Sequence, residues 1–186
     1  MRKIILTILL VCATISTFAQ ENENKSESKA LDFMSASSAL MKKEFYDLGS
    51  VKGVKCRVLI ITNVLQNTKI GCLRLETSYY AGNYSSDTYI GTLDYDEIED
   101  CISSINYIKD NVLPNKPASY TEIEYSTRDN IEVGAYYNTK KSSWTAYVYT
   151  KSYTSRSAEY FDSTSLSDLV AIMVQAKNMI AEKIQQ

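Results

Sequence analysis

One stretch of this chain occurs twice, and this repeat constrains the fold more than any other feature. Residues 89–100 read YIGTLDYDEIED and run on, as far as Val112, into a helix with an apolar stripe. At a shift of 71 residues, Tyr160 to Lys183 has the same layout, beginning YFDSTSLSDLVA. The repeat predicts a chain built from two similar halves, although any two amphipathic helices with acidic starts would share part of this pattern.

Both copies carry the signals of a helix start. Asp94 aligns with Ser165, and Glu97 aligns with Asp168. Asp and Ser are good N-cap residues, and an acidic residue three positions later is the layout of a capping box. Neither helix is long enough to be stable alone in water, so each apolar stripe is expected to lie on a sheet. The two stripes have helical spacing and consist of Ile98, Cys101, Ile102, Ile105 and Ile108, and of Leu169, Ile172, Met173, Ala176 and Ile180.

Three strands are predicted before each helix, because segments rich in β-branched residues are separated there by polar turns. The expected strands are residues 39–48, 55–64 and 69–80 in the first half, and 120–127, 131–137 and 142–153 in the second. Residues 28–43 could also begin as a helix. Together these elements predict an α+β fold, in which two β-β-β-α repeats form one antiparallel sheet of about six strands with both helices on one face.

The alternation of apolar residues also predicts which side of each hairpin faces the helices. Gln66 is expected opposite Lys69 in the first hairpin, and Tyr137 opposite Ser142 in the second. A slip of one residue would mix the apolar and polar sets. The helix-facing side then holds Val58, Ile60, Thr62, Leu73, Leu75 and Thr77, and Ile131, Val133, Ala135, Trp144, Ala146 and Val148. Cys56 and Cys72 fall on opposite faces, so no disulfide between them is expected.

The N-terminus has the three-part form of a secretory signal peptide. Residues 1–19 combine a basic start, an apolar run too short to span a bilayer comfortably, and a small residue at the end. Cleavage is predicted after Ala19, which places the mature protein in the periplasm or outside the cell. A lipid-modified Cys12 is the weaker alternative, because Val11 stands where a lipoprotein signal needs a small residue. No transmembrane segment is predicted.

The rest of the chain is predicted to be a spacer followed by one domain. Residues 20–29 are polar and cannot bury enough apolar surface to order themselves, so they are expected to be a flexible spacer. Residues 30–186 are long enough for a single α+β domain with a sizeable core. Its halves cover roughly 39–113 and 118–186, and the only two prolines of the chain lie between them, where they end the first helix.

Charge and composition exclude several functions. Removal of the signal leaves a net charge of −4, because it takes two of the 20 basic residues and none of the 22 acidic ones. Without a basic block, no nucleic-acid binding is expected. The chain has no histidine, which removes the usual general base and most zinc sites, and it has no Gly-rich phosphate loop. The acidic run 94–100 lies at a helix start and is interpreted as capping rather than as a calcium loop. We therefore predict no metal site and no cofactor.

The candidate binding residues are aromatic. The chain has 15 tyrosines, and several are expected on the sheet face away from the helices. The simpler interpretation is a solvated sheet face, since Tyr and Thr are good strand formers. The alternative is a recognition surface, formed either by that face or by the Gly-, Asn- and Ser-rich loop 81–88. The candidate ligand-binding residues are Tyr80, Tyr84, Tyr136, Tyr147, Tyr149 and Arg74; no catalytic residue is proposed.

The segments KEFYDL (43–48), YIGTLDYDEI (89–98) and SWTAYV (143–148), together with a short signal that ends in Ala-Gln, resemble small secreted proteins of unknown function from Bacteroidetes-type bacteria. The resemblance implies export but no activity and no site residue. Two functions stay open. The first is an exported, non-enzymatic binding or interaction module for an unknown protein or glycan. The second is a periplasmic hydrolase of glycans or cell-wall polymers that uses carboxylates.

Overall fold

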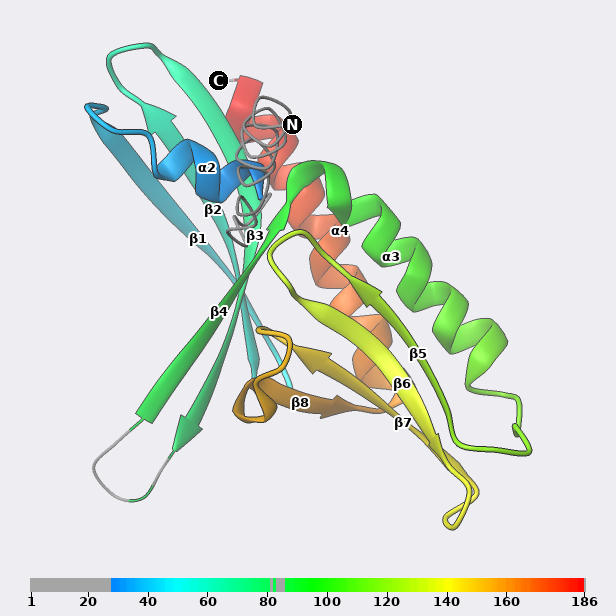
Figure 1. Ribbon diagram of the computed structural model, residues 1–186. Coiled ribbons are helices and arrows are strands. Elements are labelled where there is room, and N and C mark those ends of the chain that lie inside the picture. Colours follow the sequence, from blue (N-terminus) through cyan, green and yellow to red (C-terminus); the bar gives the residue numbers. More distant parts are fainter. Residues whose placement is uncertain (1–27, 81, 83–85, 186) are drawn as a thin grey trace, which may run out of the picture.

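The protein consists of two four-stranded antiparallel sheets and three helices in the part that the structure, a computed structural model, describes: residues 28–80, 82 and 86–185 (Figure 1). Sheet A contains, in spatial order, β1 (Met41–Val51), β2 (Val54–Asn63), β3 (Thr68–Tyr80) and β4 (Ser86–Asp94). Sheet B contains β5 (Thr121–Ser126), β6 (Glu132–Asn138), β7 (Ser143–Tyr149) and β8 (Ala158–Phe161). The helices are α2 (Lys29–Met34), α3 (Ile98–Tyr107) and α4 (Ser163–Gln185). Short helical turns accompany them: η1 (Tyr95–Glu97) before α3, η2 (Ile108–Val112, a π-helical turn) after α3, and η3 (Ser155–Ser157) before β8.

The prediction of one sheet of about six strands with two helices on one face is wrong, although the α+β class is correct. Each half has a fourth strand, β4 or β8, immediately before its helix. The sheets approach each other at Gly91 of β4, which lies beside Ile131 and Thr150, the residues that flank β6 and β7. A Cβ atom there would lie 2.4 Å from Ile131 Cγ1 and 2.5 Å from the Thr150 carbonyl oxygen. The missing side chain at Gly91 allows this close approach, and the Thr77 and Thr150 hydroxyls, 2.7 Å apart, form a further contact. Among the described strands, none of sheet A pairs with one of sheet B.

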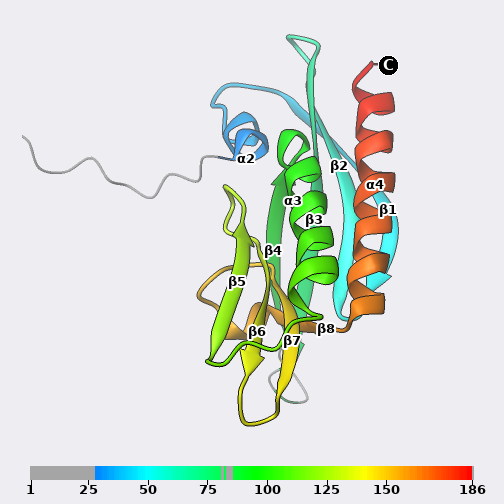
Figure 2. The same cartoon turned by 90° about the vertical axis from the view of Figure 1, so that its right-hand side faces the viewer.

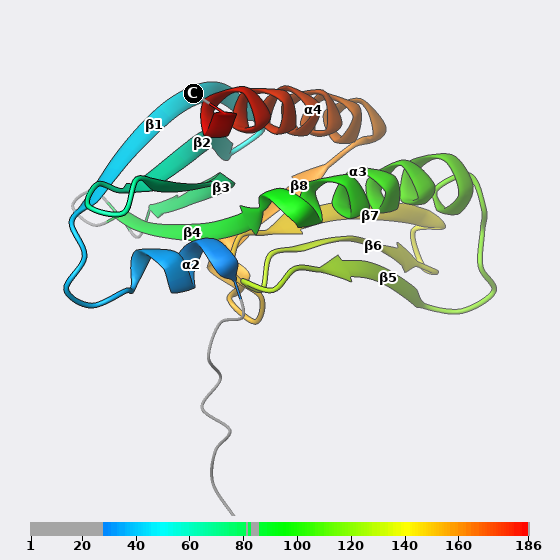
Figure 3. The same ribbon diagram turned by 90° about the horizontal axis from the view of Figure 1, so that it is seen from above.

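The two long helices are exchanged between the halves. Helix α4, at the end of the second half, packs on β1, β2 and β3 of sheet A, whereas α3 packs on β6 of sheet B (Figure 3). The contact is close at Gly71, where a Cβ atom would lie 2.6 Å from Ile180 Cγ2. The helices run side by side (Figure 2). Both halves share the order of four strands and a helix; a duplication as the origin of this order stays a prediction.

The main core lies between the helices and the two sheets, and the predicted helix stripes face it. Ile98, Cys101, Ile105 and Ile108 are buried, as are Leu169, Met173, Ala176 and Ile180, with Ile172 partly buried. The predicted faces of the hairpins are also correct, but their registers are not: Val58 lies opposite Leu73, and Ala135 lies opposite Ala146. The errors are of four and two residues, and even-numbered shifts leave every side chain on its predicted face.

A second, smaller core covers part of the other face of sheet A. Helix α2 places Ala30 against Leu59, Ile61 and Cys72 there. The three cysteines at 56, 72 and 101 are buried free thiols, and burial raises the pKa of each to about 12. Among the described helices, none has the length and apolar character needed to cross a membrane.

The predicted helix caps are only partly correct. Glu97 Oε2 accepts a hydrogen bond from the Asp94 amide (3.3 Å), as a capping box requires. The Asp94 side chain completes this capping box by accepting from the Glu97 amide, so the predicted cap of the first helix is confirmed. The same carboxylate also accepts from the Lys29 amide (2.8 Å) and the Ala30 amide (3.0 Å) at the start of α2. Ser165 was expected to cap the second helix, and this is wrong. The helix starts two residues earlier, at Ser163.

Candidate functional site

A connected row of tyrosine rings crosses the outward side of sheet B. Because side chains alternate along a strand, the inward positions of β6 and β7 that face the core leave Tyr136, Tyr147 and Tyr149 on the opposite side. The ring centroids of Tyr136 and Tyr147 are 6.3 Å apart, those of Tyr147 and Tyr149 are 5.1 Å apart, and Tyr120 lies 6.4 Å from Tyr136. Tyr160 of β8 lies opposite Tyr147. We call Tyr120, Tyr136, Tyr147, Tyr149 and Tyr160 the tyrosine face.

A glycine makes room for the tyrosine at the centre of the tyrosine face. A Cβ atom on Gly134 would lie 2.7 Å from the Tyr147 hydroxyl, so the Tyr147 ring lies directly over the β6 backbone. Tyr147 is only 5% exposed, and its hydroxyl donates to Glu124 Oε2 at 3.3 Å. Tyr120 and Tyr160, at the two ends of the row, are 60% and 54% exposed. The face therefore has an immobilised centre and two accessible ends.

Three carboxylates lie beside these rings. Glu122 and Glu124 occupy outward positions of β5, and Glu132 occupies one of β6. Burial, followed by the charges of the three glutamates, raises the pKa of Tyr147. The hydrogen bond from its hydroxyl to Glu122 raises the pKa of Tyr120 to about 12. Burial and its contact with Tyr160 raise the pKa of Tyr149. The phenols are thus neutral hydrogen-bond donors in a negative local field.

Alkaline titration should show that these phenols ionise late. An ordinary phenol has a pKa of about 10. A raised pKa in the folded state favours the neutral phenol, so the stability that it contributes is complete below about pH 10 and is lost as the pH rises through the folded-state values. The phenolate absorbance of the folded protein should therefore rise later than that of the urea-unfolded protein. Glu122→Gln should lower the pKa of Tyr120 most, because the hydrogen bond to Glu122 is the main cause of its raised pKa, and should lower that of Tyr147 less. Coinciding folded and unfolded curves would contradict this electrostatic account.

The other predicted site residues lie elsewhere. Arg74 belongs to sheet A, where its Nε bonds Glu76 Oε1 at 2.6 Å, and Arg57 contacts the same carboxylate. Although burial opposes it, these hydrogen bonds hold the pKa of Glu76 below its usual value. Tyr80 is 77% exposed at the end of β3. Tyr84 lies outside the described residues, as do residues 81, 83 and 85 of the predicted 81–88 loop, and residues 86–88 belong to strand β4 instead. The structure therefore brings Tyr136, Tyr147 and Tyr149 together and separates them from Arg74 and Tyr80.

Sequence reasoning missed two of the five residues of the tyrosine face, Tyr120 and Tyr160. Tyr120, Glu122 and Glu124 follow a period of two at the start of a predicted strand, and that signal alone could have placed them on one face. Tyr160 could not be placed, because β8 was not recognised as a strand and the pairing of Tyr160 with Tyr147 depends on it.

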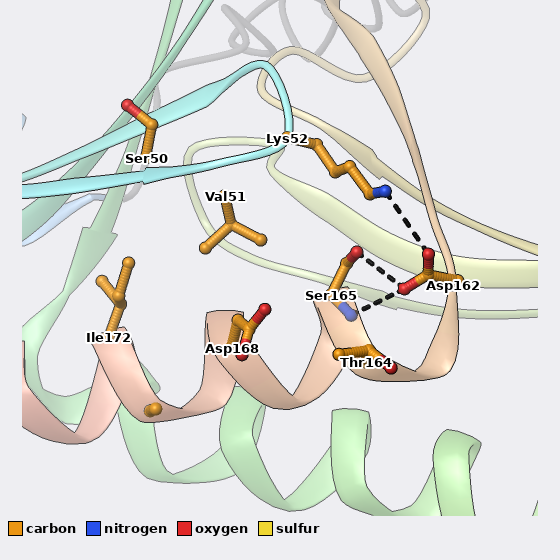
Figure 4. A pocket seen from close by; sticks show the side chains of 9 residues that line it. Ser50, Val51, Lys52, Asp162, Thr164, Ser165, Asp168 and Ile172 are labelled. Carbon is orange, nitrogen blue, oxygen red and sulfur yellow. Dashed lines mark hydrogen bonds and ion pairs between the residues drawn. The ribbon is translucent and has the colours of Figure 1, made fainter.

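A pocket of about 580 Å³ lies between the β1–β2 turn and the start of α4 (Figure 4). It contains two carboxylates, Asp162 and Asp168. Asp162 Oδ1 accepts from the Ser165 amide (2.8 Å) and hydroxyl (2.7 Å), and Oδ2 pairs with Lys52 Nζ (3.3 Å). The bonds from Ser165 lower the pKa of Asp162 to about 2. This carboxylate is a helix cap that stays ionised, so it is unsuited to donate a proton to a leaving group.

Comparisons of the chain with protein-family models, curated proteins and solved structures gave no match. The arguments on function rest on the chain's own residues.

Proposed function

We propose that this protein is an exported binding module and that the tyrosine face of sheet B is its ligand-binding surface. The observation that carries the proposal is the continuous contact of aromatic rings across the strands of sheet B, from Tyr120 to Tyr149, with carboxylates beside them. Tyrosine offers a wide contact area at a low cost in side-chain entropy and is enriched at interfaces.

The charge of the surface indicates the chemistry of the ligand. The outward positions of β5 to β8 carry three glutamates and no lysine or arginine, within the strand residues that the structure describes. Neutral phenol rings and nearby carboxylates both attract cations, by the ring quadrupole and by direct charge. The proposed ligand is therefore a partner that presents ammonium or guanidinium groups, such as a basic protein segment.

Export is the second part of the proposal. It is supported by the three-part form of residues 1–19 and by the resemblance of the chain to small secreted bacterial proteins. Residues 1–27 lie outside the described part of the chain. The intact mass of the secreted protein should equal that of a chain that begins at Gln20. A mass that includes Met1 would contradict cleavage.

Binding can be tested with hexalysine as the probe and isotope-labelled mature protein as the receptor. Hexalysine should shift the ring resonances of Tyr136, Tyr147 and Tyr149, while hexaglutamate should not. Glu122→Gln combined with Glu132→Gln should weaken binding by about tenfold, because the double variant removes two of the three charges and keeps the side-chain shapes. Tyr153→Ala is the matched control, because Tyr153 is 99% exposed and outside the tyrosine face. If hexalysine does not bind, or binds the double variant equally well, the proposed function is wrong.

A further inference from the structure

A groove lies at one edge of sheet B, between α3 and β5. Its volume is about 370 Å³. It is lined by Ser103, Ser104, Tyr107, Ile108, Ile123, Glu124 and Tyr125. Ile123 and Tyr125 point inward toward the main core, and Tyr107 is 58% exposed at the rim. The groove is therefore suited to apolar side chains that enter from the edge of the sheet.

The backbone beside this groove is unpaired on one side. Within the described strands, β5 pairs with β6 alone and forms the edge of sheet B (Figure 3). The Thr127 amide donates to the Ile131 carbonyl at 2.9 Å. In an antiparallel ladder this direction alternates, so the amides and carbonyls of Glu122 and Glu124 point away from β6. Such a row of free backbone groups is a template for another strand.

The two sides of the edge differ in chemistry. The inward side is the apolar groove, and the outward side carries the Glu122 and Glu124 carboxylates next to Tyr120. Successive side chains of any strand added here would point to these two sides in turn. Residues directly opposite Glu122 and Glu124 would project onto the acidic side, where opposite charges stabilise a cross-strand pair.

We propose that an extended segment of a partner protein, with alternating basic and apolar residues, adds to β5 as a fifth strand of sheet B. Its basic side chains lie beside Glu122 and Glu124, and its apolar side chains enter the groove between α3 and β5. A segment of about six residues, roughly 20 Å long, matches the length of β5. The need for basic residues rests on the proposed function, whereas the backbone pairing and the apolar groove are independent observations.

The test compares two peptides of one composition, the alternating KVKVKV and the block KKKVVV. The alternating peptide should bind the mature protein at least about tenfold more tightly, and it should protect the amides of Glu122 and Glu124 from hydrogen exchange. Glu122→Pro should remove this preference, because proline deletes an outward-pointing amide that no described strand uses. Glu122→Gln isolates the loss of charge, since it keeps the amide. Lys43→Pro is the matched control and should leave the preference unchanged. Lys43 lies in β1, the edge strand of sheet A, and its backbone amide points away from β2.

The outcomes separate the two proposals. Equal binding of both peptides, or equal affinities of Glu122→Pro and Glu122→Gln for KVKVKV, would overturn strand addition. If hexalysine still binds the tyrosine face in that case, the proposed binding function stands and only the strand addition is wrong. If no basic peptide binds, both proposals fall.

Discussion

Ile180→Ala is expected to destabilise the protein by about 2–5 kcal/mol. Ile180 is fully buried near the C-terminus of α4, where it packs against sheet A of the first half. Truncation removes buried methyl groups and leaves a cavity between the helix and β3, which the surrounding sheet cannot close. Urea denaturation of wild type and variant measures the difference in the free energy of unfolding.

A double-mutant cycle tests the exchange of helices directly. Gly71→Ala alone should cost about 1–3 kcal/mol, because its Cβ would lie 2.6 Å from Ile180 Cγ2 and 2.9 Å from Ile60 Cδ1. The new methyl group fits into the space that Ile180→Ala opens, so the double variant should be more stable than the sum of the single effects predicts. Gly91→Ala combined with Ile180→Ala is the control and should be additive, because Gly91 abuts Ile131 and Thr150. Additive effects at Gly71 would show that α4 does not lie on sheet A.

Local patterns predicted local structure well. The spacing of apolar residues identified the buried sides of α3 and α4, and the period of two identified the core face of each hairpin. The core position of Trp144 was also correct. Its ring packs beside the core at 5.4 Å from the Tyr137 ring, and its Nε1 donates to the Asn115 carbonyl at 2.7 Å. These predictions depend only on neighbours within a few residues.

The arrangement of the halves depends on contacts between distant residues, and the sequence pattern does not carry them. The sequence predicts no separate strand at β4, because YIGTL stands directly before the acidic cap of a helix. Nothing local indicates that α4 packs on the opposite half, since an apolar stripe fits any apolar sheet face. The one sequence feature that indicates the contact between the halves is Gly91, because a glycine within a strand can mark the close approach of another backbone.

The candidate site shows the same division. Alternation placed Tyr136, Tyr147 and Tyr149 on one face, and the structure brings their rings together. Arg74 lies on the corresponding sheet face of the first half, but there it forms an ion pair with Glu76 within sheet A. Equivalent positions in the two halves therefore carry different chemistry, and only the fold shows that the two faces belong to separate sheets.

Asp94→Ala is expected to release α2 from the domain. Asp94 is 1% exposed, and its side chain accepts hydrogen bonds from Ser28 Oγ (3.1 Å) and from the Lys29 and Ala30 amides. It also pairs with the Arg128 guanidinium at 3.1 Å, as Asp96 does. Without this carboxylate, the first amides of a one-and-a-half-turn helix lose their acceptor in a buried place, and unsatisfied buried donors cost about 1–3 kcal/mol each. We expect a loss of about 2–4 kcal/mol in the free energy of unfolding. Asp96→Ala is the matched control, because the half-exposed Asp96 bonds Arg128 and the Lys29 side chain but no α2 amide; its cost should stay below about 1 kcal/mol.

Thiol labelling distinguishes release of α2 from general unfolding. Cys72 lies under α2 in the smaller core, whereas Cys56 and Cys101 lie in the main core. Under native conditions, a thiol reagent followed by mass spectrometry should therefore modify Asp94→Ala at Cys72 first and leave the other two cysteines protected. Equal labelling of all three would mean that the whole domain has opened. Protection of Cys72 in the variant would mean that α2 is held by its apolar contacts alone, and the acceptor role of Asp94 would then be dispensable.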